Sequence, residues 1–169
     1  RPAMLRFLSL FLLILVGLFT AELTRPAQEA LVQPWTATLA RLCAAVITRF
    51  DRHVVALGDV LESTTNGFAV SIRAGCNGVE ATLILVAAIL AFPAPWTRKA
   101  AGIAAGVAAV QVLNLVRVVS LFYLGQWNRV AFEWAHLYLW QTLIMVDVLV
   151  VWLLWLRWVR VEPAPRAPA

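Results

Sequence analysis

Long apolar segments with few charges restrict the fold of this chain more than any other feature. Residues Phe7 to Phe19 contain no charged side chain, and further apolar segments follow in the second half of the chain. About 20 mostly apolar residues suffice for a helix to cross the roughly 30 Å hydrocarbon core of a bilayer. The composition agrees, since 62% of the 169 residues are hydrophobic and only 14% are charged. We therefore predict an all-α membrane protein with about four transmembrane helices.

We place the spans at about 5–23, 78–92, 100–124 and 132–158, within a single integral membrane domain over residues 1–161. Gly102 and Gly106 give the third span a small-xxx-small face for helix packing. A cleaved signal peptide is the alternative to the first span, but Phe19 stands where cleavage needs a small residue. Residues 162–169 alternate Pro and Ala, which is typical of a disordered tail.

Basic residues mark one end of the predicted spans. They are Arg6, Arg98, Lys99, Arg157 and Arg160. The positive-inside rule makes that end cytoplasmic, so residues 24–75 face the periplasm if the membrane is a bacterial inner membrane. The net charge of +5 does not indicate a nucleic-acid partner, because the basic residues form no contiguous patch with interleaved aromatics. The expected partner of this multi-pass protein is the lipid bilayer.

The periplasmic segment 24–75 contains two predicted elements. From Pro34 to Phe50, apolar residues recur at helical spacing, and a proline suits the first turn of a helix. We predict an amphipathic helix that lies on the outer membrane surface or caps the bundle. Between residues 60 and 73, apolar and polar residues alternate after Asn66-Gly67, which predicts a short β-hairpin.

Three chemically distinct side chains return to one depth on three predicted spans. At about 1.5 Å of helical rise per residue, Cys76 lies about 33 Å and Arg117 about 28 Å from Arg98. His136 lies about 31 Å from Arg157 by the same measure. These lengths match the thickness of the hydrocarbon core. We therefore expect a thiol, a guanidinium and an imidazole to meet at the outer interface.

Each of these residues also has an ordinary structural interpretation. Cys76 could be a small buried hydrophobe, Arg117 a snorkelling interfacial residue and His136 an interfacial histidine. Catalysis is the sharper hypothesis. Cys76 stands at a loop-to-helix junction, where a helix N-terminus lowers the pKa of a thiol. Arg117 lies in an apolar run and could stabilise a thiolate or an oxyanion, while histidine is the usual general acid and base near neutral pH.

Two asparagines are candidates for supporting roles. Asn77 adjoins Cys76, and Asn114 lies one turn before Arg117, where it could orient the guanidinium or bond to a neighbouring helix. Neither a metal nor a cofactor is expected, because the two cysteines and two histidines lack zinc-site spacing. Whether Cys43 pairs with any other group stays open.

Three segments carry a resemblance to a known family. AGCNGV at 74–79, NLVRVV at 114–119 and FEWAH at 132–136 occur in that order. They resemble the nucleophile segment, the N-x-x-R segment and the late histidine of the exosortase/archaeosortase family. The chain looks most like the small exosortase H branch, and the resemblance covers about Val60 to Trp158.

The resemblance implies a membrane cysteine protease or transpeptidase with Cys76, Arg117 and His136 as its catalytic residues. Such enzymes are thought to cleave C-terminal sorting signals of secreted proteins at the outer face of the inner membrane. The signal comprises a short motif, a hydrophobic helix and a basic tail. An acyl-enzyme would form on the thiol, and water or an unknown amine or lipid acceptor would release it.

Two other classes of function remain open. The chain could be a non-enzymatic membrane scaffold or assembly subunit in which Cys76 is only structural. Alternatively, it could be a thiol-redox membrane protein that uses Cys43 and Cys76. Retained processing after Cys76→Ala would favour the scaffold, and a Cys43–Cys76 disulfide that cycles with a quinone would favour redox chemistry.

Overall fold

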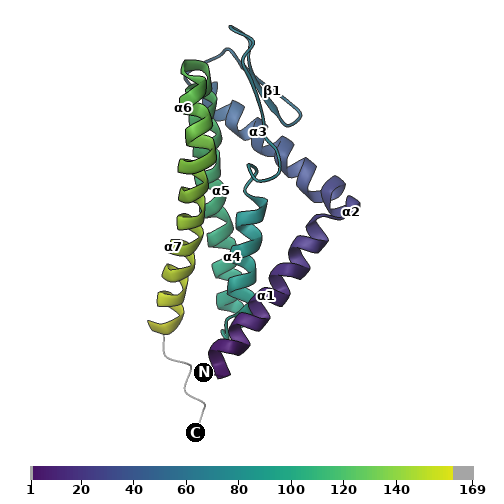
Figure 1. Cartoon of the computed structure of the whole chain (residues 1–169), viewed down its shortest axis with the longest axis vertical. Coiled ribbons are helices and arrows are strands. Elements are labelled where there is room, and N and C mark those ends of the chain that lie inside the picture. Colours follow the sequence, from purple (N-terminus) through teal and green to yellow (C-terminus); the bar gives the residue numbers. More distant parts are fainter. Residues whose placement is uncertain (1, 162–169) are drawn as a thin grey trace.

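The computed structural model describes residues 2–161, so Arg1 and the predicted tail at 162–169 lie outside the described residues. Helices make up most of the chain, and a small sheet covers one end of it (Figure 1). The elements are α1 (Pro2–Glu22), α2 (Arg25–Ala27), the π-helical η1 (Gln28–Val32), α3 (Gln33–Ile47), β1 (Val54–Leu57), β2 (Val60–Ser63), β3 (Ala69–Ser71), α4 (Val79–Ala91), α5 (Trp96–Trp127), α6 (Arg129–Trp134), the π-helical η2 (Ala135–Leu139) and α7 (Trp140–Val161).

Two long helices each run through a π-helical segment. One comprises α2, η1 and α3, and we call it the α2–α3 helix; the other comprises α6, η2 and α7. The α2–α3 helix meets α1 at a corner, where Thr24 Oγ1 donates to the Ala21 carbonyl at 2.6 Å. Pro26 stands in the first turn after the corner, where its missing N–H leaves no helical hydrogen bond unmade.

Four helices are long and apolar enough to cross a membrane, namely Ala3–Glu22, Arg25–Ile47, Trp96–Trp127 and Arg129–Arg160. The predicted all-α membrane fold is confirmed. Three of these helices overlap the spans predicted at 5–23, 100–124 and 132–158. The span predicted at 78–92 is not among the four, because α4 has only 13 residues, or roughly 20 Å of helical rise. The predicted amphipathic helix, by contrast, belongs to a 23-residue helix of spanning length.

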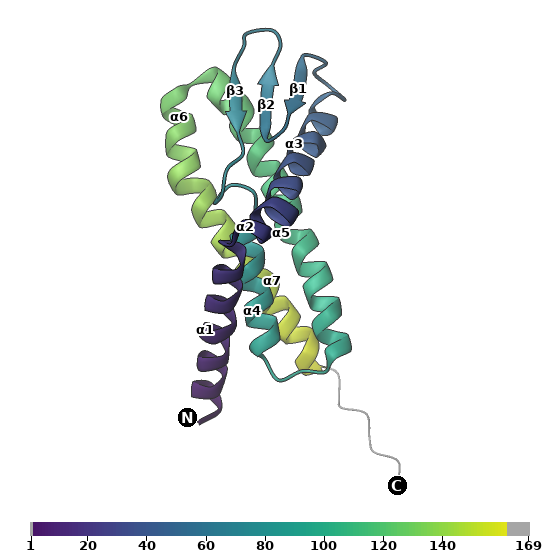
Figure 2. The same cartoon turned by 90° about the vertical axis from the view of Figure 1, so that its right-hand side faces the viewer.

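The α2–α3 helix runs obliquely between the sheet and the rest of the bundle (Figures 1 and 2). Its α3 part contacts β1, β2 and α5. The side chains on its buried face are Thr36, Leu39, Ala40, Cys43 and Ile47. The helical periodicity predicted for 34–50 is present as far as Ile47. Only part of the apolar face packs against protein, since Leu42 and Val46 on the same helix are exposed.

The sheet is antiparallel with the order β1-β2-β3. Strands β2 and β3 form the predicted hairpin. Strand β1 was not predicted, although Leu57 pairs with Val60 across the two-residue turn Gly58-Asp59. Gly58 has a φ of +62°, which tight hairpin turns require and glycine adopts readily. The Gly-Asp pair between two apolar runs is the signal that could have revealed this strand.

Two buried clusters hold the molecule together. The first joins α3, the sheet and α5, and its members include Leu39, Cys43, Leu61, Ile72 and Phe122. The second joins α4, α5 and α7, and its members include Leu85, Ile89, Val110, Ile144 and Trp155. In the second cluster, a Cβ at Gly102 would collide with the Trp155 indole, and one at Gly106 would meet Leu85. The predicted small-residue face of the third span is thus a close helix contact.

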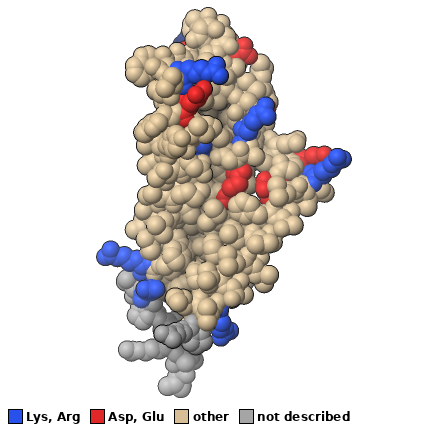
Figure 3. Space-filling view, viewed as in Figure 1, with Lys and Arg blue, Asp and Glu red and all other residues tan. Residues whose placement is uncertain are grey.

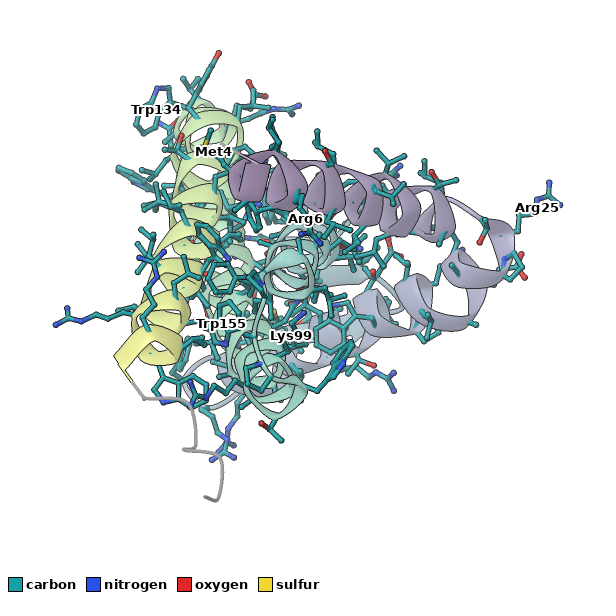
Figure 4. All side chains as sticks on the ribbon, turned by 90° about the horizontal axis from the view of Figure 1, so that it is seen from below. Met4, Arg6, Arg25, Lys99, Trp134 and Trp155 are labelled. Carbon is teal, nitrogen blue, oxygen red and sulfur yellow. The ribbon has the colours of Figure 1, made fainter. Side chains whose placement is uncertain are left out.

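Basic side chains gather at the end where α1 begins and α7 ends (Figures 1 and 3). On the face shown in Figure 3, an uncharged belt separates them from the mixed charges of the other half. Seen from that end, Arg6 and Lys99 lie over the bundle (Figure 4). The arrangement agrees with the charge pattern from which we predicted the cytoplasmic side.

Candidate active site

Cys76 lies in the loop that joins β3 to α4. Gly75 and Gly78 flank it with φ values of +81° and +75°, a conformation that costs glycine little. Helix α4 begins only at Val79. The depth assigned to Cys76 from the sequence assumed helix all the way from Arg98, and this assumption is wrong, because residues 72–78 and 92–95 are not helical.

His136 approaches the same loop from the last long helix. Its Nε2 lies 3.0 Å from the Sγ of Cys76. The residue sits in η2, and such π-helical turns occur often at functional sites because they redirect side chains. Its ring stacks on Phe132 at 5.7 Å between centroids, which fixes the plane of the imidazole. The predicted nucleophile and base are therefore within hydrogen-bond distance.

Arg117 completes the group from α5. Its Nη2 lies 3.5 Å from the Sγ of Cys76, and its Nη1 donates to the Gly75 carbonyl at 3.4 Å. The side chain is only 3% exposed. The structure thus brings together all three residues that were predicted as catalytic, each from a different element.

Side chains from other helices hold the Cys76 loop by its carbonyl groups. Trp35 on α3 donates from Nε1 to the Asn77 carbonyl at 3.1 Å. Gln111 on α5 donates from Nε2 to the Gly78 carbonyl at 3.2 Å, and Arg117 holds the Gly75 carbonyl. The loop conformation therefore depends on α3 and α5 as well as on its own glycines.

The side chain of Asn77 anchors the loop rather than facing the sulfur. Its Nδ2 donates to Thr36 Oγ1 at 3.1 Å, and its Oδ1 accepts the Val79 N–H at 3.1 Å. The residue is 1% exposed. Its contribution is to fix the start of α4 against α3.

Asn114 makes neither of the contacts suggested from the sequence. It is fully buried, and its side-chain oxygen and nitrogen have no hydrogen-bond partner among the described residues. It packs instead beside Gly78, where an added Cβ would lie 3.1 Å from Asn114 Nδ2. Its proximity to the loop, rather than a bond to Arg117, is what the structure shows.

Burial raises the pKa of the Cys76 thiol above its ordinary value; the Arg117 guanidinium opposes this rise, and the Glu80 carboxylate adds to it. The lowered pKa expected from the sequence is therefore not present. The helix N-terminus lies beyond Cys76, and Glu80 Oε1 accepts the Gly75 N–H at 2.6 Å, which brings a negative charge to the loop. Cys76 consequently keeps its proton at neutral pH, with His136 placed to accept it.

Residues 2–153 match the model of a family described as transmembrane exosortase. The chain belongs to the transmembrane exosortase family. No curated protein matches this exosortase-family chain, and no solved structure matches it. The family match includes Cys76, Arg117 and His136 and agrees with the resemblance seen in the sequence. Cys43 is also a free thiol, but it is buried in the first cluster.

Sequence reasoning missed four residues of the site, namely Trp35, Thr36, Glu80 and Gln111. Trp35 and Thr36 lie on the predicted amphipathic helix, but no pattern in the sequence indicates that this helix reaches the Cys76 loop. Glu80 carried a usable signal, since it is an acidic residue in the first turn of an apolar helix.

Proposed function

We propose that this exosortase-family chain is a cysteine endopeptidase or transpeptidase that cleaves C-terminal sorting signals of secreted proteins. The observation that carries the proposal is the contact of Cys76 Sγ with His136 Nε2 at 3.0 Å and with Arg117 Nη2 at 3.5 Å. A thiol within hydrogen-bond reach of a base is the arrangement that nucleophilic catalysis requires. Family membership supports the substrate class, a short motif followed by a hydrophobic helix and a basic tail.

The chemistry begins with a protonated thiol. As Cys76 Sγ attacks the scissile carbonyl carbon, its proton passes to His136 Nε2, and Arg117 faces the negative charge that develops on the carbonyl oxygen. His136 then returns the proton to the leaving amine, so that the new amino end departs and a thioester remains. Water or an amine acceptor attacks the thioester and regenerates the thiol.

The level of the site in the membrane suits a substrate that is itself anchored there. From Arg98 to Arg117, α5 rises about 28 Å, close to the thickness of the hydrocarbon core. We place the protein in the bacterial inner membrane with the site at the periplasmic interface. A cleavage motif that emerges from the bilayer just before its own helix would arrive at this level.

The test is processing of a co-expressed secreted reporter that ends in a motif, a hydrophobic helix and a basic tail from the same genome. We expect the wild type to remove the tail and Cys76→Ala to abolish removal. His136→Ala should slow it by about 10²–10⁴-fold, the usual contribution of a general base. Arg117→Lys should fail because an ammonium lacks the planar fork of a guanidinium. Cys43→Ala is the matched control and should process normally.

Two outcomes would contradict the proposal. If the Cys76→Ala variant folds and the reporter is still processed at the wild-type rate, the chain would be a scaffold for another enzyme. A disulfide between Cys43 and Cys76 that forms and breaks with the quinone pool would make it a redox protein. Both thiols are free in the structure, so mass spectrometry of the alkylated protein distinguishes the redox case directly.

A further inference from the structure

A separate cavity lies beside the Cys76 loop, between α1, the α2–α3 helix, α4 and α5. Its volume is about 630 Å³, within the roughly 300–1,000 Å³ of sites that bind small molecules. Most of its wall is apolar, with side chains such as Leu18, Ala21, Leu31, Pro34, Leu83 and Val107. We call it the lateral cavity.

Below the lateral cavity, α1 packs against α4. There, the Phe7 ring contacts the rings of Phe92 and Trp152 with centroids 6.4 and 6.0 Å apart. Above this contact, α1 and α4 diverge towards the corner with the α2–α3 helix (Figure 1). A transmembrane helix needs the full hydrocarbon depth of about 30 Å, and the contact between α1 and α4 occupies the lower part of this depth. A flexible acyl chain that enters from the side needs only part of that depth.

The polar end of the cavity carries an acid without a cation. Glu22 is the one charged side chain in its wall, as far as the described residues go, and it is only 9% exposed. Its Oε1 accepts from Gln28 Nε2 at 2.8 Å, and within residues 2–161 its Oε2 has no hydrogen bond and no ion pair. Arg25, the nearest cation along the chain, projects outward at the corner (Figure 4). A largely buried carboxylate favours a cationic donor.

Glu22 also lies at the level of lipid headgroups. Helix α1 has 21 residues, which amounts to roughly 31 Å of rise. With its basic start at one membrane surface, its last residue reaches the opposite one. An acyl chain that extends from there into the lateral cavity would follow the upper part of α4.

We propose that the lateral cavity binds one phospholipid with a primary-amine headgroup, such as phosphatidylethanolamine. One acyl chain fills the apolar part, and the ammonium donates to Glu22 Oε2. The bound lipid contacts Trp35 and Gln111, which hold two carbonyls of the Cys76 loop. This inference concerns binding alone and does not depend on the chemistry of Cys76.

The experiment is native mass spectrometry of the full chain in mild detergent with added lipids. Phosphatidylethanolamine, phosphatidylcholine and phosphatidylglycerol with identical acyl chains are compared at equal concentration. We expect one retained phosphatidylethanolamine, at roughly tenfold or more above phosphatidylcholine, as for one hydrogen bond between charged groups. Equal retention of all three lipids would overturn the proposal.

Matched variants separate the headgroup from the acyl chain. Glu22→Gln should remove the preference for the amine, whereas Glu29→Gln, an exposed acid outside the cavity wall, should keep it. Ala27→Phe should fill the cavity and release the lipid, whereas Ala105→Phe, which is exposed on α5, should not. An unchanged preference in Glu22→Gln would overturn the assignment. Displacement of the lipid by a synthetic transmembrane peptide would also overturn the assignment, because it would show that the cavity binds a helix.

Discussion

At the scale of single residues, Glu80 opposes the activation that a nucleophilic thiol usually receives. Its carboxylate holds the Gly75 N–H at 2.6 Å and, together with burial, raises the pKa of Cys76 against the effect of Arg117. Thiols are oxidised mainly as thiolates, so a protonated Cys76 is protected from oxidation. The same protonation makes His136 the group on which any nucleophilic step depends.

The first prediction concerns the pH dependence of Cys76 alkylation in a Cys43→Ala background. Because the folded-state pKa is raised, the rate should reach half its maximum above the ordinary thiol value of about 8.5. Glu80→Gln should lower this midpoint, since it removes a negative charge that favours the thiol. Arg117→Gln should raise it, since it removes a cation that favours the thiolate. Mass spectrometry after timed exposure to a maleimide gives the alkylation midpoint of each variant. Midpoint shifts of the opposite sign would refute the electrostatic account.

The second prediction compares two left-handed glycines. Gly78 has a φ of +75°, and an added Cβ would lie 2.9 Å from the amide group of Gln111. Gly67 has a φ of +72° with open space around it. Each change to alanine should cost about 1–2 kcal/mol for the left-handed backbone, measured by thermal unfolding. Only Gly78→Ala should also displace the Cys76 loop and reduce reporter processing; an equal loss in Gly67→Ala would count against this role for Gly78.

At the scale of the elements, the contact between α5 and α7 depends on a glycine. Gly102 lies against the Trp155 indole, whose Nε1 donates to the Arg98 carbonyl at 3.0 Å. Since no side chain fits at that point, the two helices approach closely, as small-residue faces allow in membranes. The contact lies at the end of the bundle where α5 begins and α7 ends.

The third prediction tests that contact. Gly102→Ala should destabilise the bundle by about 1–3 kcal/mol, as overpacking of a filled interior does. Gly17→Ala is the matched control, because nothing lies within 4 Å of a Cβ there and alanine is the better helix former. Unfolding in mixed detergent micelles gives both values. Equal stability of the two variants would mean that α5 and α7 can shift freely against each other.

The elements also show how far the sequence could predict this structure. Long apolar runs predicted the membrane-spanning helices, and apolar periodicity predicted the helix at 34–50. Estimated depth and the motifs together predicted Cys76, Arg117 and His136. Strand β1 was not predicted because its four residues are too short for a long alternating pattern. The π-helical turn at His136 was not predicted because it leaves no periodic signal in the sequence. The hydrogen bonds that link Trp35 and Thr36 with Asn77 join residues more than 40 positions apart. A local sequence pattern does not reveal contacts at that separation.

At the scale of the whole molecule, the course of the α2–α3 helix decides the topology. Its length allows it to span a membrane, but its buried face packs on the sheet and α5. Helix α5 has 32 residues, or roughly 48 Å, and exceeds the hydrocarbon thickness. We therefore propose that the α2–α3 helix, the sheet and the end of α5 form a layer outside the bilayer.

The fourth prediction is that reporter fusions after Arg98 and at the C-terminus read as cytoplasmic, and a reporter in the β2–β3 turn at Asn66 reads as periplasmic. The positive-inside rule motivates the first two, and the surface position of the α2–α3 helix motivates the third. A cytoplasmic signal at Asn66 would mean that this helix crosses the membrane. A periplasmic signal at Arg98 would put the site on the cytoplasmic side, away from secreted substrates.

The order in which the chain is made gives the Cys76 loop a further significance. Trp35 and Cys76 are synthesised first, Gln111 and Arg117 follow, and His136 comes after them, on the helix that comprises α6, η2 and α7. An incomplete chain in the insertion machinery therefore carries Cys76 without its contact to His136 and with a loop that is only partly held. If Cys76 is the proposed nucleophile, its activity would begin only after the helix that carries His136 has been inserted, so a partly synthesised copy would not attack neighbouring proteins.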